Sequence, residues 1–127
     1  MLIDFTIRNF MSYRDEVSLS MVASTTVKEC ESNDSYSNVS FTESGKRYLR
    51  TAAIYGANGS GKSSVIAAMN IFKSVVLQSF VDDNIVKSLS KLYYRFDVES
   101  AKMPISMQMI FVSDGERYRY GFEVSQG

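Results

Sequence analysis

Apolar and polar side chains alternate along the N-terminal residues, which is the pattern of a strand with one buried face. Residues 2–10, LIDFTIRNF, place Ile3, Phe5 and Ile7 on the same side of such a strand. Residues 17–23, VSLSMVA, alternate again at Val17, Leu19 and Met21. The intervening SYRDE has the composition of a turn, so we predict an antiparallel hairpin.

A second hairpin is predicted near the C-terminus, where Asp114 and Gly115 form the sequence typical of a type I′ turn. With these two residues as the loop, one face pairs apolar side chains throughout: Phe111 with Tyr118, Met109 with Tyr120, Met107 with Phe122 and Ile105 with Val124. The other face is mixed, with Val112 opposite Arg117, Ile110 opposite Arg119, Gln108 opposite Gly121 and Ser106 opposite Glu123. We interpret the methionine and aromatic stripe as core, with a ligand-binding surface as the alternative.

Between the hairpins, apolar residues recur at the three- and four-residue spacing of an amphipathic helix: Val65, Ile66, Met69, Phe72, Val76 and Phe80. A short apolar strand, Ala52–Tyr55, is predicted before this helix, and another around Tyr93–Val98 after it. Residues 24–48 are polar and are predicted to be mostly loop. We expect a short strand at Val39–Phe41 and a turn at Ser44 and Gly45 within them.

The segment TAAIYGANGSGKSSVIAAM, residues 51–69, contains a complete phosphate-binding loop: Gly56, four residues, then Gly61, Lys62 and Ser63. Glycines can take positive φ and bring bare backbone N–H groups close to anionic oxygens. The helix that follows directs its N-terminus, with unpaired N–H groups, at the same phosphates. An accidental Gly/Ser-rich turn is the alternative, but the predicted strand and helix on either side supply the context that the motif requires.

The loop predicts a binding site for ATP and Mg²⁺. Lys62 is expected to place its ammonium between the β- and γ-phosphates and to supply catalytic charge. The Ser63 hydroxyl is expected to coordinate Mg²⁺, and the Ser64 hydroxyl to donate to the α-phosphate. The predicted nucleotide-binding residues are Gly56, Ala57, Asn58, Gly59, Ser60, Gly61, Lys62, Ser63 and Ser64.

Composition excludes several other kinds of chemistry. The 127 residues are 45% hydrophobic, enough for one globular domain, and 14 basic residues balance 14 acidic ones. A neutral chain provides no overall field for nucleic acid, so any DNA or RNA contact must be local. Histidine is absent, and Cys30 is the single cysteine, beside Glu29 and Glu31, so we interpret it as an inert thiol. No apolar run approaches a membrane span, and we expect a cytoplasmic location without a membrane partner.

A small basic cluster, GKRYLR at residues 45–50, is the local candidate for a nucleic-acid contact. A solvated hairpin arm is the favoured alternative, because only Tyr48 offers an aromatic ring among the charges.

The order of these segments resembles the start of ABC-type ATPase heads, such as those of the SMC proteins and RecF. The N-terminal strand ends in Asn9-Phe10-Met11-Ser12-Tyr13, which is similar to the family pattern Asn-Phe-x-Ser-Phe/Tyr, and Gly56–Ser63 matches Gly-x-Asn-Gly-Ser-Gly-Lys-Ser. The segment SMVAST and the strand RYRYGFEV also resemble bacterial AAA-family ATPases of abortive infection and phage defence, which are relatives of the OLD family.

The resemblance implies an α/β fold, the N-terminal lobe of an ABC-type P-loop head. Such a lobe has antiparallel strands around one strand–P-loop–helix unit and an incomplete parallel sheet. It also implies a homodimer with ATP held between two heads, in which ATP hydrolysis drives gating or assembly in phage defence or DNA metabolism. A nuclease is a candidate effector partner. Asn9, Ser12, Tyr13 and Arg14 are expected beside the adenine, ribose or phosphates, with a plain strand turn as the alternative.

Three features of such heads are not visible in this sequence: a Ser-Gly signature, a Walker B strand that ends in Asp-Glu, and a switch residue near the end of the head. Met109–Asp114 and Tyr93–Glu99 are weak Walker B candidates, and ordinary strands are the favoured interpretation of both. Gln108 is a similarly weak candidate for a Mg²⁺ or water ligand. We therefore expect residues 1–127 to be the N-terminal nucleotide-binding lobe of a longer ATPase. Alternative functions are a non-catalytic assembly subunit that gates a nuclease and a small P-loop kinase.

Overall fold

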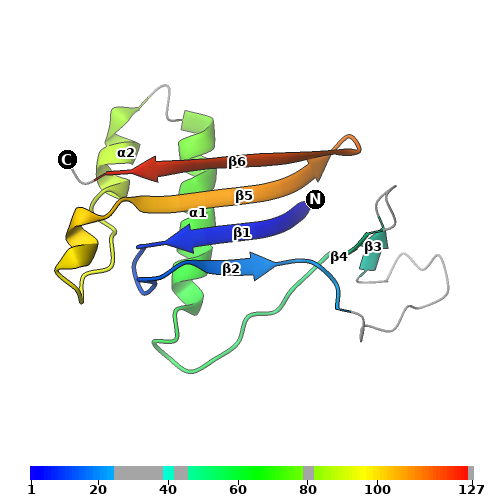
Figure 1. Ribbon diagram of the computed structural model, residues 1–127, viewed down its shortest axis with the longest axis horizontal. Coiled ribbons are helices and arrows are strands. Elements are labelled where there is room, and N and C mark those ends of the chain that lie inside the picture. The colour runs from blue at the N-terminus through cyan, green and yellow to red at the C-terminus, as the bar shows by residue number, and fades with distance from the viewer. Residues whose placement is uncertain (25–38, 42–45, 79–81, 126–127) are drawn as a thin grey trace.

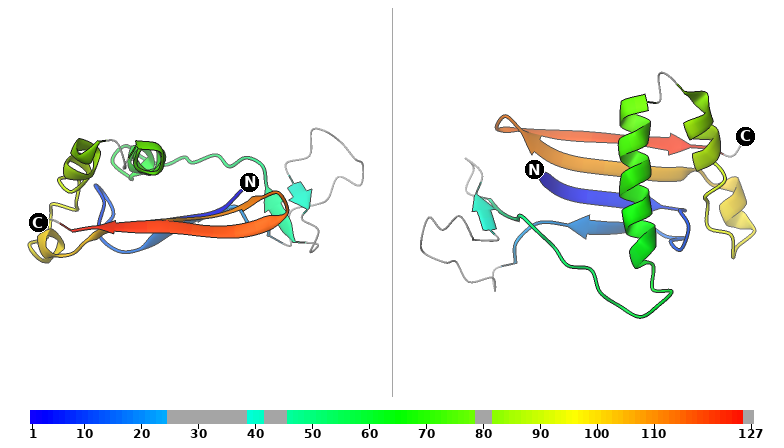
Figure 2. Two further views of the ribbon diagram at one scale, coloured as in Figure 1. Left: turned by 90° about the horizontal axis from the view of Figure 1, so that it is seen from above. Right: turned by 180° about the vertical axis from the view of Figure 1, so that it is seen from behind.

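A computed structural model of the chain describes residues 1–24, 39–41, 46–78 and 82–125. They form two main layers, a four-stranded sheet and a layer of helices on one of its faces (Figure 1, Figure 2). The strands lie in the order β2 (Val17–Ser20), β1 (Leu2–Arg8), β5 (Ile105–Ser113) and β6 (Glu116–Val124). All of these pairings are antiparallel, so the expected incomplete parallel sheet is not present in the part of the chain that the structure describes.

The N-terminal hairpin is confirmed, because β1 pairs with β2 from Asp4 opposite Ser20 to Ile7 opposite Val17. The prediction that Ile3 shares a face with Phe5 and Ile7 is wrong. The register between β1 and β5 shifts between Leu2 and Asp4, as at a β-bulge, and such a shift changes which face the next side chain occupies. Phe5 and Ile7 therefore pack under the helices, whereas Ile3 is buried in a second cluster.

The C-terminal hairpin is confirmed in every pair, from Ser113 opposite Glu116 to Ile105 opposite Val124. Asp114 and Gly115 both have positive φ, 51° and 77°, as a type I′ turn requires. The predicted apolar face is buried mainly at its end far from the turn, where Met107 is 1% exposed. Near the turn the same face is more open, and Tyr118 is 44% exposed.

Helix α1 (Lys62–Gln78) crosses the strands and covers the sheet (Figure 2). Its buried apolar residues are Val65, Ala68, Phe72 and Val75. The Phe72 ring stacks on Phe122 with 5.4 Å between centroids and meets Phe5 edge-on at 5.6 Å. The helix was expected at this place, but the expected face is only partly correct. Ile66 and Val76 are exposed, because the buried stripe follows Val65 by three, seven and ten residues. Phe80 lies outside the described residues.

A small second sheet pairs β3 (Val39–Phe41) with β4 (Arg47–Leu49), which confirms the short strand predicted there. The predicted turn at Ser44 and Gly45, and most of the polar segment 24–48, lie outside the described residues. Tyr48 is 4% exposed and packs with Ile3 and Ile110. Because its ring is buried, Tyr48 is not available to stack on a nucleic-acid base.

Residues 82–103 contain a second helix, α2 (Asp83–Leu89), and a short 3₁₀ helix, η1 (Glu99–Lys102). Asp82 caps α2 by accepting a hydrogen bond from the Asn84 N–H at 2.9 Å. The strand predicted around Tyr93–Val98 is not formed. Instead, its Tyr94 N–H donates to the side-chain carbonyl of Asn9, after β1, at 3.2 Å, and the preceding Leu92 carbonyl accepts a hydrogen bond from the Met11 N–H at 2.8 Å.

The segment Ala52–Tyr55 also forms no strand, contrary to the prediction. It is exposed, and Tyr55 retains 92% of its accessible surface. A strand requires a neighbour to pair with its backbone, and no described strand pairs with these residues. None of the helices in the described ranges is long and apolar enough to cross a membrane.

Candidate functional site

The phosphate-binding loop connects the exposed segment Ala52–Tyr55 to α1, which begins at Lys62. Gly59 and Gly61 have φ of 81° and 96°, in the region that favours glycine. Gly56, the first glycine of the motif, does not have positive φ. A Cβ at Gly56 would instead lie 2.8 Å from the Ser60 hydroxyl oxygen. The loop thus turns at its second and third glycines and ends at a helix N-terminus.

The Lys62 ammonium folds back over this loop. Its Nζ donates to the carbonyl of Gly56 at 2.5 Å, to the carbonyl of Ala57 at 2.8 Å and to the Ser60 hydroxyl at 3.5 Å. The positive charge is therefore held inside the curve of the loop, where the motif would receive a phosphate group. Within the described residues Lys62 has no ion pair with a carboxylate, so an incoming anion competes only with neutral oxygens.

Ser63 is exposed on the first turn of α1. It lines a shallow groove of about 450 Å³ together with Lys62 and three apolar residues, Ala52, Ile54 and Ile66. No group of three or more acidic or cysteine side chains that could hold a metal ion occurs among the residues with described positions. Among the side chains that line this groove, that of Ser63 carries an oxygen atom, the kind of ligand that Mg²⁺ prefers.

Ser64 differs from its neighbour because it is only 4% exposed. Its hydroxyl forms a hydrogen bond of 2.9 Å with the hydroxyl of Ser12. Tyr13 also reaches the loop, since its hydroxyl donates to the Gly61 carbonyl at 3.0 Å. Two of the four residues expected beside the site therefore contact the phosphate-binding segment directly.

The other two residues of that set, Asn9 and Arg14, contact residues 94–103. Asn9 is 1% exposed and hydrogen-bonds to Tyr94, Ser100 and Met103. Arg14 forms an ion pair with Asp97, with 3.0 Å between Nε and Oδ2. Both side chains hold the segment after α2 against the turn that follows β1.

The weak Walker B candidates have structural roles. Asp114 occupies the turn between β5 and β6. Asp97 pairs with Arg14, and its carboxylate also accepts a hydrogen bond from the Glu99 N–H at 3.1 Å. Gln108 lies in the middle of β5, between Thr6 of β1 and Gly121 of β6. In the described parts of the chain, the contacts of these residues do not include the phosphate-binding loop.

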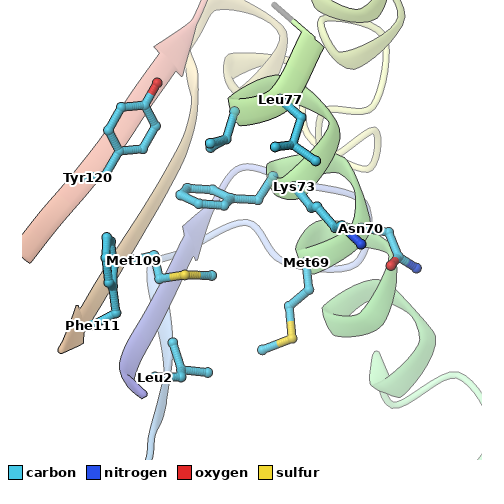
Figure 3. A pocket seen from close by; sticks show the side chains of 10 residues that line it. Leu2, Met69, Asn70, Lys73, Leu77, Met109, Phe111 and Tyr120 are labelled. Atoms are coloured by element: carbon cyan, nitrogen blue, oxygen red, sulfur yellow. The ribbon is translucent and has the colours of Figure 1, made fainter. Parts of the chain in front are cut away.

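A larger groove of about 640 Å³ lies between α1 and the sheet, as Figure 3 shows. Its lining is mostly apolar, with Leu2, Met69, Met109 and Phe111 among the side chains. Lys73 and Asn70 stand on the α1 side of the opening. Such a mostly apolar lining, with one lysine and one asparagine at its edge, does not suit a triphosphate, which needs several convergent polar groups.

Sequence reasoning missed the atoms through which Ser12 and Tyr13 reach the loop. Their position at a strand end was a signal that they are near it. The partners, Ser64 and the Gly61 carbonyl, lie 52 and 48 residues away in the chain, and no local pattern predicts such contacts.

Residues 52–127 match the family described as "AAA domain, putative AbiEii toxin, Type IV TA system". A search of curated proteins found no match to this chain. The matched region includes the phosphate-binding loop, α1, α2 and the hairpin β5–β6, and it supports a nucleotide-binding, ATPase-like domain of the AAA type. Since the match covers more than half of the sequence, this chain belongs to the family described as "AAA domain, putative AbiEii toxin, Type IV TA system".

Proposed function

We propose that residues Gly56–Ser64 bind ATP with Mg²⁺, and that the chain supplies the nucleotide-binding lobe of an ABC/SMC-like ATPase. The observation that carries this proposal is the Lys62 ammonium, held by loop carbonyls within a glycine turn at the N-terminus of α1. An ammonium beside the N-terminus of a helix, where the helix dipole and backbone N–H groups favour negative charge, is an arrangement that binds a polyphosphate.

The chain's own residues account for binding and orientation. Lys62 would leave its contacts with Gly56 and Ala57 and move its charge onto the β- and γ-phosphates. The backbone N–H groups of the loop would take the remaining oxygens, and the exposed Ser63 hydroxyl would orient the metal. When bound, Mg²⁺ neutralises charge that develops on the phosphoryl oxygens.

The biological role that we propose is nucleotide-dependent gating or assembly in phage defence, in line with the words "AbiEii toxin" and "Type IV TA system" in the family description. ATP between two heads of a homodimer, a nuclease effector and a cytoplasmic location are part of this proposal. This proposal is supported by the motifs Asn9–Tyr13 and Gly56–Ser63, which resemble those of SMC, RecF and OLD-related ATPases.

A second candidate is a subunit that binds ATP and changes its assembly without turnover. It is favoured by one observation, that the carboxylates of Asp97 and Asp114 take part in an ion pair and a turn rather than in contacts with the loop. Size-exclusion chromatography with and without ATP, together with phosphate release, separates the two candidates.

Titration of ATP·Mg²⁺ against the wild-type chain and Lys62→Ala tests the binding site. Loss of one charge-assisted phosphate contact is expected to cost about 2 kcal/mol or more, which is a factor of roughly 30 or more in Kd. Lys73→Ala is the matched control, since Lys73 is an exposed lysine of the same helix that lines the apolar groove. Equal affinity for wild type and Lys62→Ala would overturn the proposal.

A further inference from the structure

We propose that Tyr13 is a positioning residue for phosphate binding, which rests on the function proposed above. Its hydroxyl fixes the Gly61 carbonyl, so that the N–H of the same peptide unit, that of Lys62, points toward the incoming phosphate. Ser12 holds the neighbouring turn through Ser64. The matched family region begins at residue 52, so this contribution comes from a part of the chain outside the match.

Gly61 is the point where the loop needs an external restraint. Its φ of 96° lies in a region that glycine adopts readily. Because glycine has no Cβ, its backbone rotates more freely than that of any other residue. The Gly61 carbonyl accepts hydrogen bonds from the N–H groups of Ser64 at 3.1 Å and Val65 at 3.3 Å. The Tyr13 hydroxyl is a third donor at 3.0 Å, and the only one of the three that comes from outside α1 and its loop.

Fixing this carbonyl also fixes the Lys62 N–H. In a planar trans peptide the C=O and N–H bonds point in opposite directions. The Gly61 carbonyl points along α1, because it accepts hydrogen bonds from N–H groups in the first turn of this helix. The Lys62 N–H therefore points the opposite way, out of the helix N-terminus. A rotation of this peptide would turn the N–H away from the phosphate, and the Tyr13 contact opposes that rotation.

The Tyr13 ring closes off the space beside Gly61. A Cβ at Gly61 would lie 2.8 Å from the Tyr13 hydroxyl oxygen and 3.0 Å from the ring carbon that bears it. The tyrosine therefore abuts the backbone of the loop rather than the groove beside Ser63. With the Ser12–Ser64 hydrogen bond of 2.9 Å, two consecutive residues contact the loop on both sides of Lys62 and Ser63.

The turn that carries Ser12 and Tyr13 is itself firmly held. Phe10 and Tyr13 exchange two backbone hydrogen bonds, each of 2.8 Å, and Asn9 N–H donates to the Arg14 carbonyl at 3.1 Å. Phe10 is fully buried in the main core. A support that is anchored in the core is able to restrain a loop that is otherwise exposed.

The experiment measures the affinity of Tyr13→Phe for two ligands, ATP·Mg²⁺ and inorganic triphosphate·Mg²⁺. Phenylalanine keeps the ring and removes only the hydroxyl. Loss of one neutral hydrogen bond is expected to weaken both ligands by the same factor, about 3- to 10-fold, because the effect acts on the loop and not on the base. Ser12→Ala is expected to weaken both by about 2- to 5-fold through the second contact.

Tyr118→Phe is the matched control, since the Tyr118 hydroxyl bonds to Glu116 on the distant hairpin, and its affinities should equal those of the wild type. A loss with ATP but not with triphosphate would show that Tyr13 acts on the nucleoside, and would overturn the proposal. Unchanged affinity for both ligands would overturn it as well. A comparison of the wild-type and Lys62→Ala chains tests the binding site separately. If both chains bound triphosphate with equal affinity, the proposed site and the role of Tyr13 would both be overturned.

Discussion

Replacement of Asn9 tests whether this residue supports the fold or contacts the nucleotide. The Asn9 amide donates to the carbonyls of Ser100 and Met103, both at 2.8 Å, and its carbonyl oxygen accepts from the Tyr94 N–H at 3.2 Å. The side chain is 1% exposed, and the residue has a φ of 52°. Two acceptors and one donor fix the orientation of the amide, so each of its bonds is lost in Asn9→Ala.

The expected loss of stability follows from these contacts. A buried hydrogen bond contributes about 1 kcal/mol net. Of the three partners left behind, the Ser100 carbonyl is in a buried hydrogen bond, and the Met103 carbonyl and the Tyr94 N–H are in partly buried ones. Alanine at a left-handed φ costs about 1 kcal/mol more than asparagine, which tolerates that region. We therefore expect Asn9→Ala to lower the free energy of unfolding by about 4 kcal/mol, a large part of the 5–15 kcal/mol typical of a domain.

Urea denaturation followed by circular dichroism measures this loss, with Asn9→Gly as the matched variant. Glycine loses the same three hydrogen bonds but accepts the positive φ, so it should be more stable than the alanine variant by up to about 1 kcal/mol. Wild-type stability in Asn9→Ala, accompanied by loss of ATP affinity, would refute the reasoning. It would show that Asn9 is a nucleotide ligand and that its buried contacts contribute little.

Two further predictions concern the hairpin β5–β6 and catalysis. Phe111→Asp should destabilise the chain by about 2 kcal/mol more than Arg119→Asp. The Phe111 ring stacks on Tyr118 at 5.5 Å beside the apolar groove, whereas Arg119 is exposed. An equal loss of stability for the two variants in urea denaturation would contradict the register. The 127-residue chain should bind ATP but release phosphate near the background rate, because the sequence lacks a Walker B carboxylate pair. Turnover of about 1 s⁻¹ that disappears in Lys62→Ala would contradict this prediction. It would show that a catalytic carboxylate among Asp97, Glu99 and Asp114 was missed.

The parts of the fold that the sequence predicts well are those specified by neighbouring residues. The hairpin β5–β6 is correct in every pair, because the turn at Asp114 and Gly115 sets the register of both strands by itself. The start of α1 is likewise set by the loop that precedes it. Each of these signals lies within about ten residues of the structure that it determines.

The wrong predictions share a different cause. Ala52–Tyr55 and Tyr93–Val98 have the apolar composition of strands, but a strand forms only against another strand, and composition does not reveal a partner. For α1, the three- and four-residue spacing of apolar positions placed Ile66 and Val76 on the predicted buried face. Both are exposed, because apolar side chains lie on more than one side of this helix. Packing against the sheet, which spacing alone does not specify, selects Val65, Ala68, Phe72 and Val75.

The same distinction applies within the candidate site. The residues that would contact phosphate form one continuous segment, so a local motif identifies all of them. The residues that hold this segment in place, Ser12 and Tyr13, come from a turn about fifty residues earlier and act through a hydroxyl and a backbone carbonyl. A motif indicates which ligand a loop is able to bind. The orientation of the loop's binding groups depends on the residues that contact the loop from elsewhere in the chain. For this reason the ratio of the effects of Tyr13→Phe on ATP and on inorganic triphosphate tells more about the site than a further substitution within Gly56–Ser64 would.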